Sequence, residues 1–192
     1  MPSGALHNWQ TFSRCALDEI EAAHASVGGR GRGRRYATQQ INQAYVVILA
    51  SQFQRFCRDL HTEAVAHVIN HAAVLPVRAI MQARMVEARR LDMGNPNPGN
   101  IGSDFRRLGL DLWGQLGQLD PRSAVRQGKL EDLNRWRNAI AHYDFSKPAL
   151  GGQTEVQLLQ VRAWRRSCDA LAVAFDRVVG IYLTNLVGVA PW

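Results

Sequence analysis

The sequence predicts an all-α fold, an up-and-down bundle of five to six helices. Apolar residues recur at steps of three and four along most of the chain, no segment shows the strict alternation typical of a strand, and most connections are short. Helices that carry one apolar stripe each bury it against their neighbours. The 192 residues are long enough for one hydrophobic core, so we expect a single domain, 1–192.

Two long helices are expected in the N-terminal half of the chain. The first covers residues 4–27, and the second begins the bundle core, 37–187. Between them a Gly/Arg stretch, residues 28–35, is expected to form a loop, because repeated glycine disfavours helix. The inward stripe of the first helix is Leu6, Trp9, Phe12, Ala16, Ile20 and Ala23. The stripe of the second is Tyr45, Leu49, Phe53, Phe56, Leu60, Ala64 and Val68.

Shorter helices and one long final helix are expected in the C-terminal half. Pro76 opens or kinks the third helix, and residues 95–100 form a loop because two prolines and a glycine cannot continue a helix. Ser103 is expected to cap the next helix, and another runs from about Ser123 toward His142. The inward residues after Ser103 are Phe105, Leu108, Leu112, Leu116 and Leu119. Thr154 and Glu155 cap the final helix, whose stripe is Leu158, Val161, Trp164, Cys168, Leu171, Phe175, Val178 and Tyr182.

Composition narrows the classes of function. A net charge of +7 favours a polyanionic partner such as RNA, DNA or an acidic protein, although only two of the 23 basic residues are lysine, as a GC-rich genome would also produce. The three cysteines have neither metal-ligand nor disulfide spacing, so we expect buried thiols in a reducing cytoplasm. No apolar run approaches the ~20 residues of a membrane span and no secretory signal is evident, so we expect a cytoplasmic protein with no membrane partner.

The most informative segment is residues 134–143. It groups a permanent cation, Arg137, a carboxamide, Asn138, and a titratable imidazole, His142. Arginine neutralises charge that develops on phosphate oxygens, and histidine transfers protons near neutral pH. These groups are sufficient to cleave a phosphodiester without a metal or other cofactor.

The Arg137-Asn138-x3-His142 pattern resembles the signature of HEPN domains, which are all-α bundles found in prokaryotic toxins and RNA-processing enzymes. A second segment, residues 51–60 with the sequence SQFQRFCRDL, looks like the corresponding helix of the RiboL-PSP type of HEPN domain. The resemblance implies a homodimer in which the motif helices of two protomers face each other and form one composite, metal-independent RNase site. It also implies a toxin or antiviral-defence effector with a possible cognate antitoxin protein.

The residues of the motif suit this chemistry. RNA carries its own nucleophile, the 2′-hydroxyl, which His142 would deprotonate, while a histidine protonates the leaving 5′-oxygen. Arg137 would stabilise the extra charge of the transition state, and Asn138 would bind a phosphate oxygen or orient His142. DNA lacks the 2′-hydroxyl, so we expect RNA to be the substrate.

Helix geometry qualifies this assignment. Residues five apart differ by about 140° around a helix, so Arg137 and His142 do not share a narrow face. They converge if the helix ends within the motif, or if each meets the other protomer's copy. Some toxins of this class carry a modifiable tyrosine two residues after the histidine; here that position is Asp144, and Tyr143 follows the histidine directly. We therefore do not expect silencing by tyrosine modification.

Further candidates and alternatives remain open at this point. Additional RNA contacts are expected from Tyr143, Arg30, Arg32, Arg34 and Arg35. Glu63, His67 and His71 share one helix face, but no HExxH pattern or cysteine pair accompanies them and we expect no metal site. Arg137 would be structural if it paired with Glu131, Asp132 or Asp144, and His142 if it capped the helix. The alternative function is a non-catalytic RNA- or nucleotide-binding or adaptor module, and a weaker one is a DNA-binding regulator.

Overall fold

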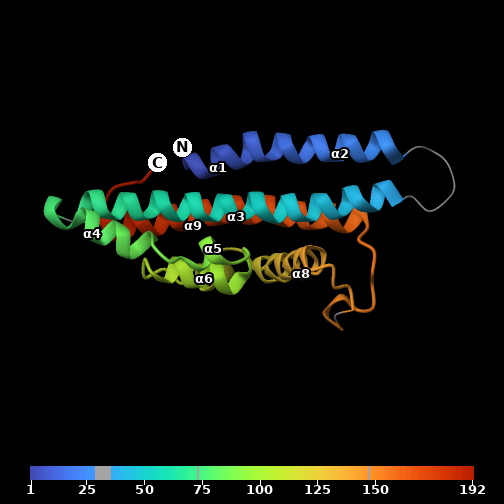
Figure 1. The fold of residues 1–192 in the computed structure, drawn as a ribbon. Helices are drawn as coiled ribbons and strands as arrows, with labels where there is room; N and C mark the ends of the chain where they lie inside the picture. Colours follow the sequence, from blue (N-terminus) through green and yellow to red (C-terminus); the bar gives the residue numbers. More distant parts are fainter. Residues whose placement is uncertain (29–35, 73, 147) are drawn as a thin grey trace.

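The computed structural model describes residues 1–28, 36–72, 74–146 and 148–192. Its described part is helical without strands, which confirms the predicted all-α bundle with somewhat more helices than five to six. Two long helices, α3 (Tyr36–Ala72) and α9 (Leu158–Val187), run side by side in the same direction through the centre (Figure 1). The segment α1–α2 covers one side of this pair, and the segment α4–α8 covers the other.

The buried stripes of α3 and α9 largely match the prediction. All seven predicted inward residues of α3 are buried, and Phe53, Phe56 and Phe175 pack ring against ring where α3 meets α9. In α9 the predicted stripe is buried except at its two ends, Leu158 and Tyr182, which are partly covered. Aromatic rings bury large apolar areas, so these contacts dominate the cohesion of the bundle.

The first helix differs from the prediction in its register. It is interrupted by a π-helical turn, Trp9–Ser13, between α1 (Gly4–Asn8) and α2 (Arg14–Gly28). A π turn inserts one extra residue, so the inward positions move by one. The side chain of Phe12 is therefore 70% exposed, and Ser13 and Leu17 are buried instead. The prediction that Phe12 faces the core was wrong for this reason. Ala23 is also exposed, whereas Ala16 and Ile20 are partly buried.

A predicted helix from Ser103 to Leu119 is two helices, α6 (Pro98–Arg106) and α7 (Leu112–Leu119). The chain turns at Gly109, whose φ of +80° is available to glycine, and a side chain there would meet the hydroxyl of Tyr182. The cap of α6 is Asn97, whose Oδ1 accepts the amide of Asn100 at 2.8 Å, and Pro98 is the first helical residue. The loop predicted for 95–100 therefore ends three residues early.

The boundaries of the remaining helices agree more closely with those predicted from the sequence. Pro76 lies in the first turn of α4 (Leu75–Val86), and a short helix, α5 (Arg90–Met93), precedes α6. The helix predicted from Ser123 is α8 (Ser123–Ala141). The cap of α9 is Gln157, in a reciprocal pair of hydrogen bonds with Gln160, rather than Thr154 or Glu155.

Two further expectations concern cysteines and membranes. Cys57 and Cys168 are buried thiols, and burial raises the pKa of each, but Cys15 is exposed. Among the described helices, α9 is long and apolar enough to cross a membrane by length and composition. Its buried stripe packs on α3 and α8, as the core helix of a bundle does.

Candidate functional site

Helix α8 carries the motif, and Trp136 fixes how the helix sits on the bundle. The Trp136 side chain is buried, with its ring centroid 6.5 Å from Trp164 on α9 and 6.4 Å from Phe145 beyond the end of α8. Trp136 is therefore part of the hydrophobic core. Its neighbours Arg137 and Asn138 are half-buried, and His142 is exposed.

The helix ends within the motif, at the histidine. Ala141 is the last residue of α8 and His142 is its C-cap, with φ −100° and ψ 0°, so the alternative in which His142 caps the helix holds for its backbone. Its imidazole makes no hydrogen bond to the helix carbonyls within the described residues. The amide of Asp144 donates to the carbonyl of Ala139 at 2.9 Å, and that of Tyr143 to Ile140 at 3.2 Å. This pair of bonds is a Schellman motif, which satisfies the last carbonyls of the helix.

Tyr143 closes that motif at an energetic cost. Its φ is +50°, in the left-handed region that usually holds glycine, and its side chain is 84% exposed. A non-glycine residue in this conformation costs roughly 1–2 kcal/mol. The ring contacts Phe145 edge to face at 5.6 Å, and most of its surface remains open to solvent. The left-handed conformation at this position is the one that the Schellman motif requires.

Asn138 is held from two sides. Its Oδ1 accepts a short hydrogen bond from Nδ2 of Asn95, in the loop before α6, and a second from Nη1 of Arg137 at 3.3 Å. Both donors point at the same oxygen, so the amide orientation of Asn138 is fixed with its NH2 group turned away from them. The loop before α6 therefore orients the central residue of the motif.

Arg137 is not neutralised by the carboxylates that α8 offers. Among the described residues, Glu131 and Asp132 both pair with Arg135, at 3.5 and 3.1 Å, and not with Arg137. Arg137 itself donates to the neutral amide of Asn138. Glu131 and Asp132 therefore do not pair with Arg137, and that alternative was wrong.

The structure brings Asn138 and His142 to one face but does not join Arg137 to His142. The amide of His142 donates to the carbonyl of Asn138 at 3.0 Å, so these two residues are one helical turn apart on α8. Within the described residues there is no hydrogen bond between the side chains of Arg137 and His142. One chain thus presents the three groups as neighbours along a helix end rather than as a closed site.

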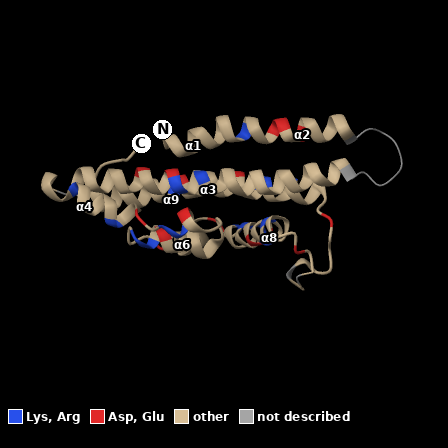
Figure 2. Cartoon of the chain, in the orientation of Figure 1, with Lys and Arg blue, Asp and Glu red and all other residues tan. Residues whose placement is uncertain are grey.

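Two clefts flank α8 on either side of Arg135. The smaller has a volume of about 300 Å³ and lies between the first turn of α6, residues 97–99, and the face of α8 that carries Glu131, Asn134, Arg135 and Asn138. The larger, about 430 Å³, lies between α8, residues 150–153 and the start of α9, with Trp136 and Trp164 among its walls. Basic and acidic residues lie close together along α8 and around α6 (Figure 2).

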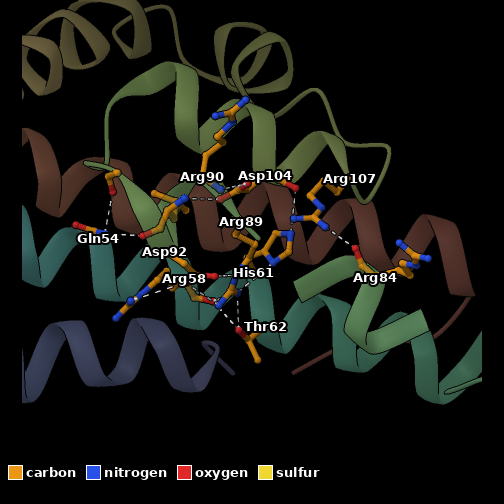
Figure 3. Close-up of polar contacts among 12 residues, drawn as sticks. Gln54, Arg58, His61, Thr62, Arg84, Arg89, Arg90, Asp92, Asp104 and Arg107 are labelled. Atoms are coloured by element: carbon orange, nitrogen blue, oxygen red, sulfur yellow. Dashed lines mark hydrogen bonds and ion pairs between the residues drawn. The ribbon is translucent and has the colours of Figure 1, made fainter. Parts of the chain in front are cut away.

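A buried polar cluster, which sequence reasoning missed, joins α3 to α5 and α6 (Figure 3). His61 is fully buried, its Nε2 donates to the main-chain oxygen of Asp104 at 3.0 Å, and its Nδ1 accepts from Arg89 at 3.4 Å. Asp104 accepts the amides of Arg90 and Leu91, both at 2.9 Å. The sequence signal was weak, because the cluster joins residues 58–62, 89–92 and 104, three segments that are far apart in the chain.

The electrostatic environment of His61 indicates that this cluster has a structural role. Burial first, and the nearby Arg89 guanidinium second, lower the pKa of His61 to about 4, so the imidazole is neutral near pH 7. Arg89 also donates to Thr62 and to the carbonyl of Arg58. Each polar group here has a partner, which is the arrangement that buried polar groups need.

The other candidate residues are accounted for. Arg55 pairs with Asp59 at 3.5 Å and Arg58 with Asp92 at 3.8 Å, as surface ion pairs. Nε2 of His67 contacts the carbonyl of Val189, and Nδ1 of His71 contacts the carbonyl of His67. Across the described ranges, no group of three or more His, Cys, Asp or Glu side chains could hold a metal ion. The predicted RNA contacts Arg30, Arg32, Arg34 and Arg35 lie outside the described residues.

Comparison with known proteins identified no similar protein. No protein-family model, curated protein or solved structure matches this chain. The case for a function therefore depends on the residues and on their geometry.

Proposed function

We propose that the protein is a metal-independent endoribonuclease of the HEPN type, acting as a homodimer through α8. The observation that carries the proposal is the end of α8, where an arginine that binds only a neutral amide among the described residues is followed five residues later by an exposed histidine. An arginine whose charge is not neutralised retains its attraction for phosphate, and an exposed imidazole is accessible to substrate. The resemblance of the Arg137-Asn138-x3-His142 pattern to HEPN domains gives this geometry its reaction class.

The reaction balances with these residues alone. A histidine at position 142 takes the proton of the 2′-hydroxyl as the 2′-oxygen forms a bond to phosphorus. The bond from phosphorus to the 5′-oxygen breaks, and a protonated imidazole returns a proton to that oxygen. The products are a 2′,3′-cyclic phosphate and a 5′-hydroxyl. Arg137 donates to the non-bridging oxygens, whose charge rises in the transition state.

A second protomer supplies what one chain lacks. Arg137 and His142 lie five residues apart and make no contact with each other in the described structure, so a single chain offers them separately. A two-fold axis beside the end of α8 would place the histidine of one chain near the arginine of the other. The imidazole that takes the 2′-proton then returns it to the 5′-oxygen, so one histidine and the arginine of the other chain complete a site.

The exposed ring of Tyr143 gives the site an additional RNA contact. Aromatic side chains stack on unpaired bases, and each such contact is worth about 1–3 kcal/mol. We assign the protein the biological role that accompanies this activity in the family it resembles, that of a cytoplasmic toxin or antiviral effector restrained by a cognate antitoxin.

The experiment is RNA cleavage in the presence of EDTA, with analysis of the product ends. Wild-type protein should leave 2′,3′-cyclic phosphates, and Arg137→Ala and His142→Ala should each abolish cleavage. The matched controls are Arg122→Ala, an exposed arginine at the opposite end of α8, and His7→Ala, an exposed histidine on α1; both should cleave normally. Binding that weakens with salt but survives His142→Ala, without any cleavage, would instead identify a non-catalytic RNA-binding module.

A further inference from the structure

A buried hydrogen-bond acceptor that is not satisfied lies beneath the wall of the smaller cleft beside α8. Asn134 is 4% exposed and lines this cleft. Its Nδ2 donates to the carbonyls of Pro96 and Leu130, at 3.0 and 2.8 Å, which fixes the orientation of the amide. Its Oδ1 has no partner among the described residues. A buried acceptor without a donor costs about 1–3 kcal/mol, so a ligand that displaces the side chains over this oxygen and supplies the donor gains affinity.

The other groups in the cleft define what that ligand must offer. Glu131 adds a carboxylate, a second acceptor, on the same face of α8 one turn before Asn134 and Arg135. Arg135 adds guanidinium donors, and its ion pairs with Glu131 and Asp132 are half-exposed and therefore weak enough to exchange. The ligand should therefore present two donors on one edge and acceptors on another.

Guanine has this distribution of groups. Its N1–H and N2 amino group are donors that suit the Asn134 and Glu131 oxygens, and its O6 and N7 are the acceptors that arginine most often binds. The turn that forms the opposite wall contains Pro98, which is largely buried, and Gly99, which is exposed and adds no side chain to the cleft. Adenine, cytosine and uracil each lack the adjacent pair of donors.

We propose that this cleft binds a guanine base of the RNA substrate. The cleft reaches Asn138, and His142 lies one helical turn further along the same face of α8. A guanine held there would place its own or a neighbouring phosphate beside the motif. This assignment rests on the proposed ribonuclease function for its substrate, and it predicts cleavage next to guanosine.

The test is calorimetric titration of the intact protein with guanosine, inosine, adenosine, cytidine and uridine 3′-monophosphates. Guanosine monophosphate should bind at least about tenfold more tightly than the last three. Inosine monophosphate, which lacks only the N2 amino group, should bind about tenfold more weakly than guanosine monophosphate. Since these nucleotides contain no scissile bond, the titration is informative whether or not the protein cleaves RNA.

Two variants locate the binding. Gly99→Leu fills the cleft and should abolish binding, whereas Gly117→Leu adds the same side chain to α7, where nothing lies within 4 Å, and should not. Glu131→Gln keeps the shape of the cleft and should reduce guanosine preference by about tenfold. Equal affinity for guanosine and adenosine monophosphates, or unchanged binding by a folded Gly99→Leu protein, would overturn the assignment. RNA cleavage without preference for guanosine would overturn it while leaving the ribonuclease function intact.

Discussion

The same kinds of side chain lie in two opposite environments in this molecule. At the junction of α3, α5 and α6, His61, Arg89 and Asp104 are buried and each has several partners (Figure 3). At the end of α8, His142 is exposed and Arg137 binds a neighbouring amide. Residue type alone does not distinguish the two places.

The difference shows how to separate structural from functional polar residues. A buried cation that is fully hydrogen-bonded holds the fold together, and breaking its contacts leaves unsatisfied groups. A partly exposed cation that has no carboxylate partner among the described residues contributes little to stability and is available to an anionic ligand. We therefore expect the two regions to respond oppositely to mutation, one through stability and the other through activity.

The largest effect should be on activity at the end of α8. Arg137→Ala and His142→Ala should each lower the rate of RNA cleavage by about 10²–10⁴-fold, because each removes a group that acts in the transition state. The free energy of unfolding, measured in urea, should change by less than about 1 kcal/mol. A large loss of stability in either variant would assign these residues to the structural class.

The junction should show the reverse pattern. Asp104→Ala leaves the amides of Arg90 and Leu91 without acceptors and should lower the free energy of unfolding by about 2–4 kcal/mol. Cleavage per folded molecule should be unchanged. The contrast between the two regions fails if Asp104→Ala unfolds in urea at the same midpoint as the wild type.

Acid should weaken the junction through His61. Its pKa is about 4 in the folded protein and about 6.5 in the unfolded chain, so between these values the unfolded chain binds the proton that the folded protein does not. The contribution of His61 to the free energy of unfolding is fully present above pH 6.5. It decreases by up to about 3 kcal/mol as the pH falls toward 4.

The measurement is urea unfolding at several pH values between 4 and 7. His61→Gln, which cannot titrate, should show a shallower slope than the wild type across this window, whatever its absolute stability. Equal slopes would mean that His61 is not the group responsible. Arg89, Asp104 and Arg107 are the charged groups around it, and they are retained in both proteins.

The smallest effect concerns the strained backbone at Tyr143. Tyr143→Gly should raise the free energy of unfolding by about 1 kcal/mol relative to Tyr143→Ala, because only glycine relieves the positive φ while both variants lose the ring. Thermal unfolding of the two variants measures the difference. Both should bind RNA more weakly if the ring stacks on a base, and identical melting temperatures would argue against strain.

The spacing of apolar residues predicted the bundle, because burial of one stripe per helix decides helix formation. It predicted α3, α8 and α9 to within a few residues. It failed at the π turn before α2 and at Gly109, where one residue changes the backbone path and shifts or ends the stripe. Such local changes depend on packing against other helices, which periodicity along one helix does not contain.

The motif was recognisable because its residues are neighbours in the chain. The residues that surround the motif could not be recognised from the sequence. Asn95 orients Asn138, and the carbonyl of Pro96 binds Asn134, but both are about 40 residues away in the chain and contact α8 only in the folded protein. The His61 cluster was hidden for the same reason, since its members come from three helices. Sequence could therefore propose the chemistry but not the cleft beside it.

If the site is shared between two chains, two inactive variants that lack different residues should restore it when they are mixed. Arg137→Ala and His142→Ala homodimers are each expected to be inactive. Unfolding and refolding them together forms heterodimers that contain one intact arginine and one intact histidine on different chains. With a shared site, RNA cleavage should reappear in the mixture. A mixture that remains as inactive as its components, although heterodimers have formed, would contradict it.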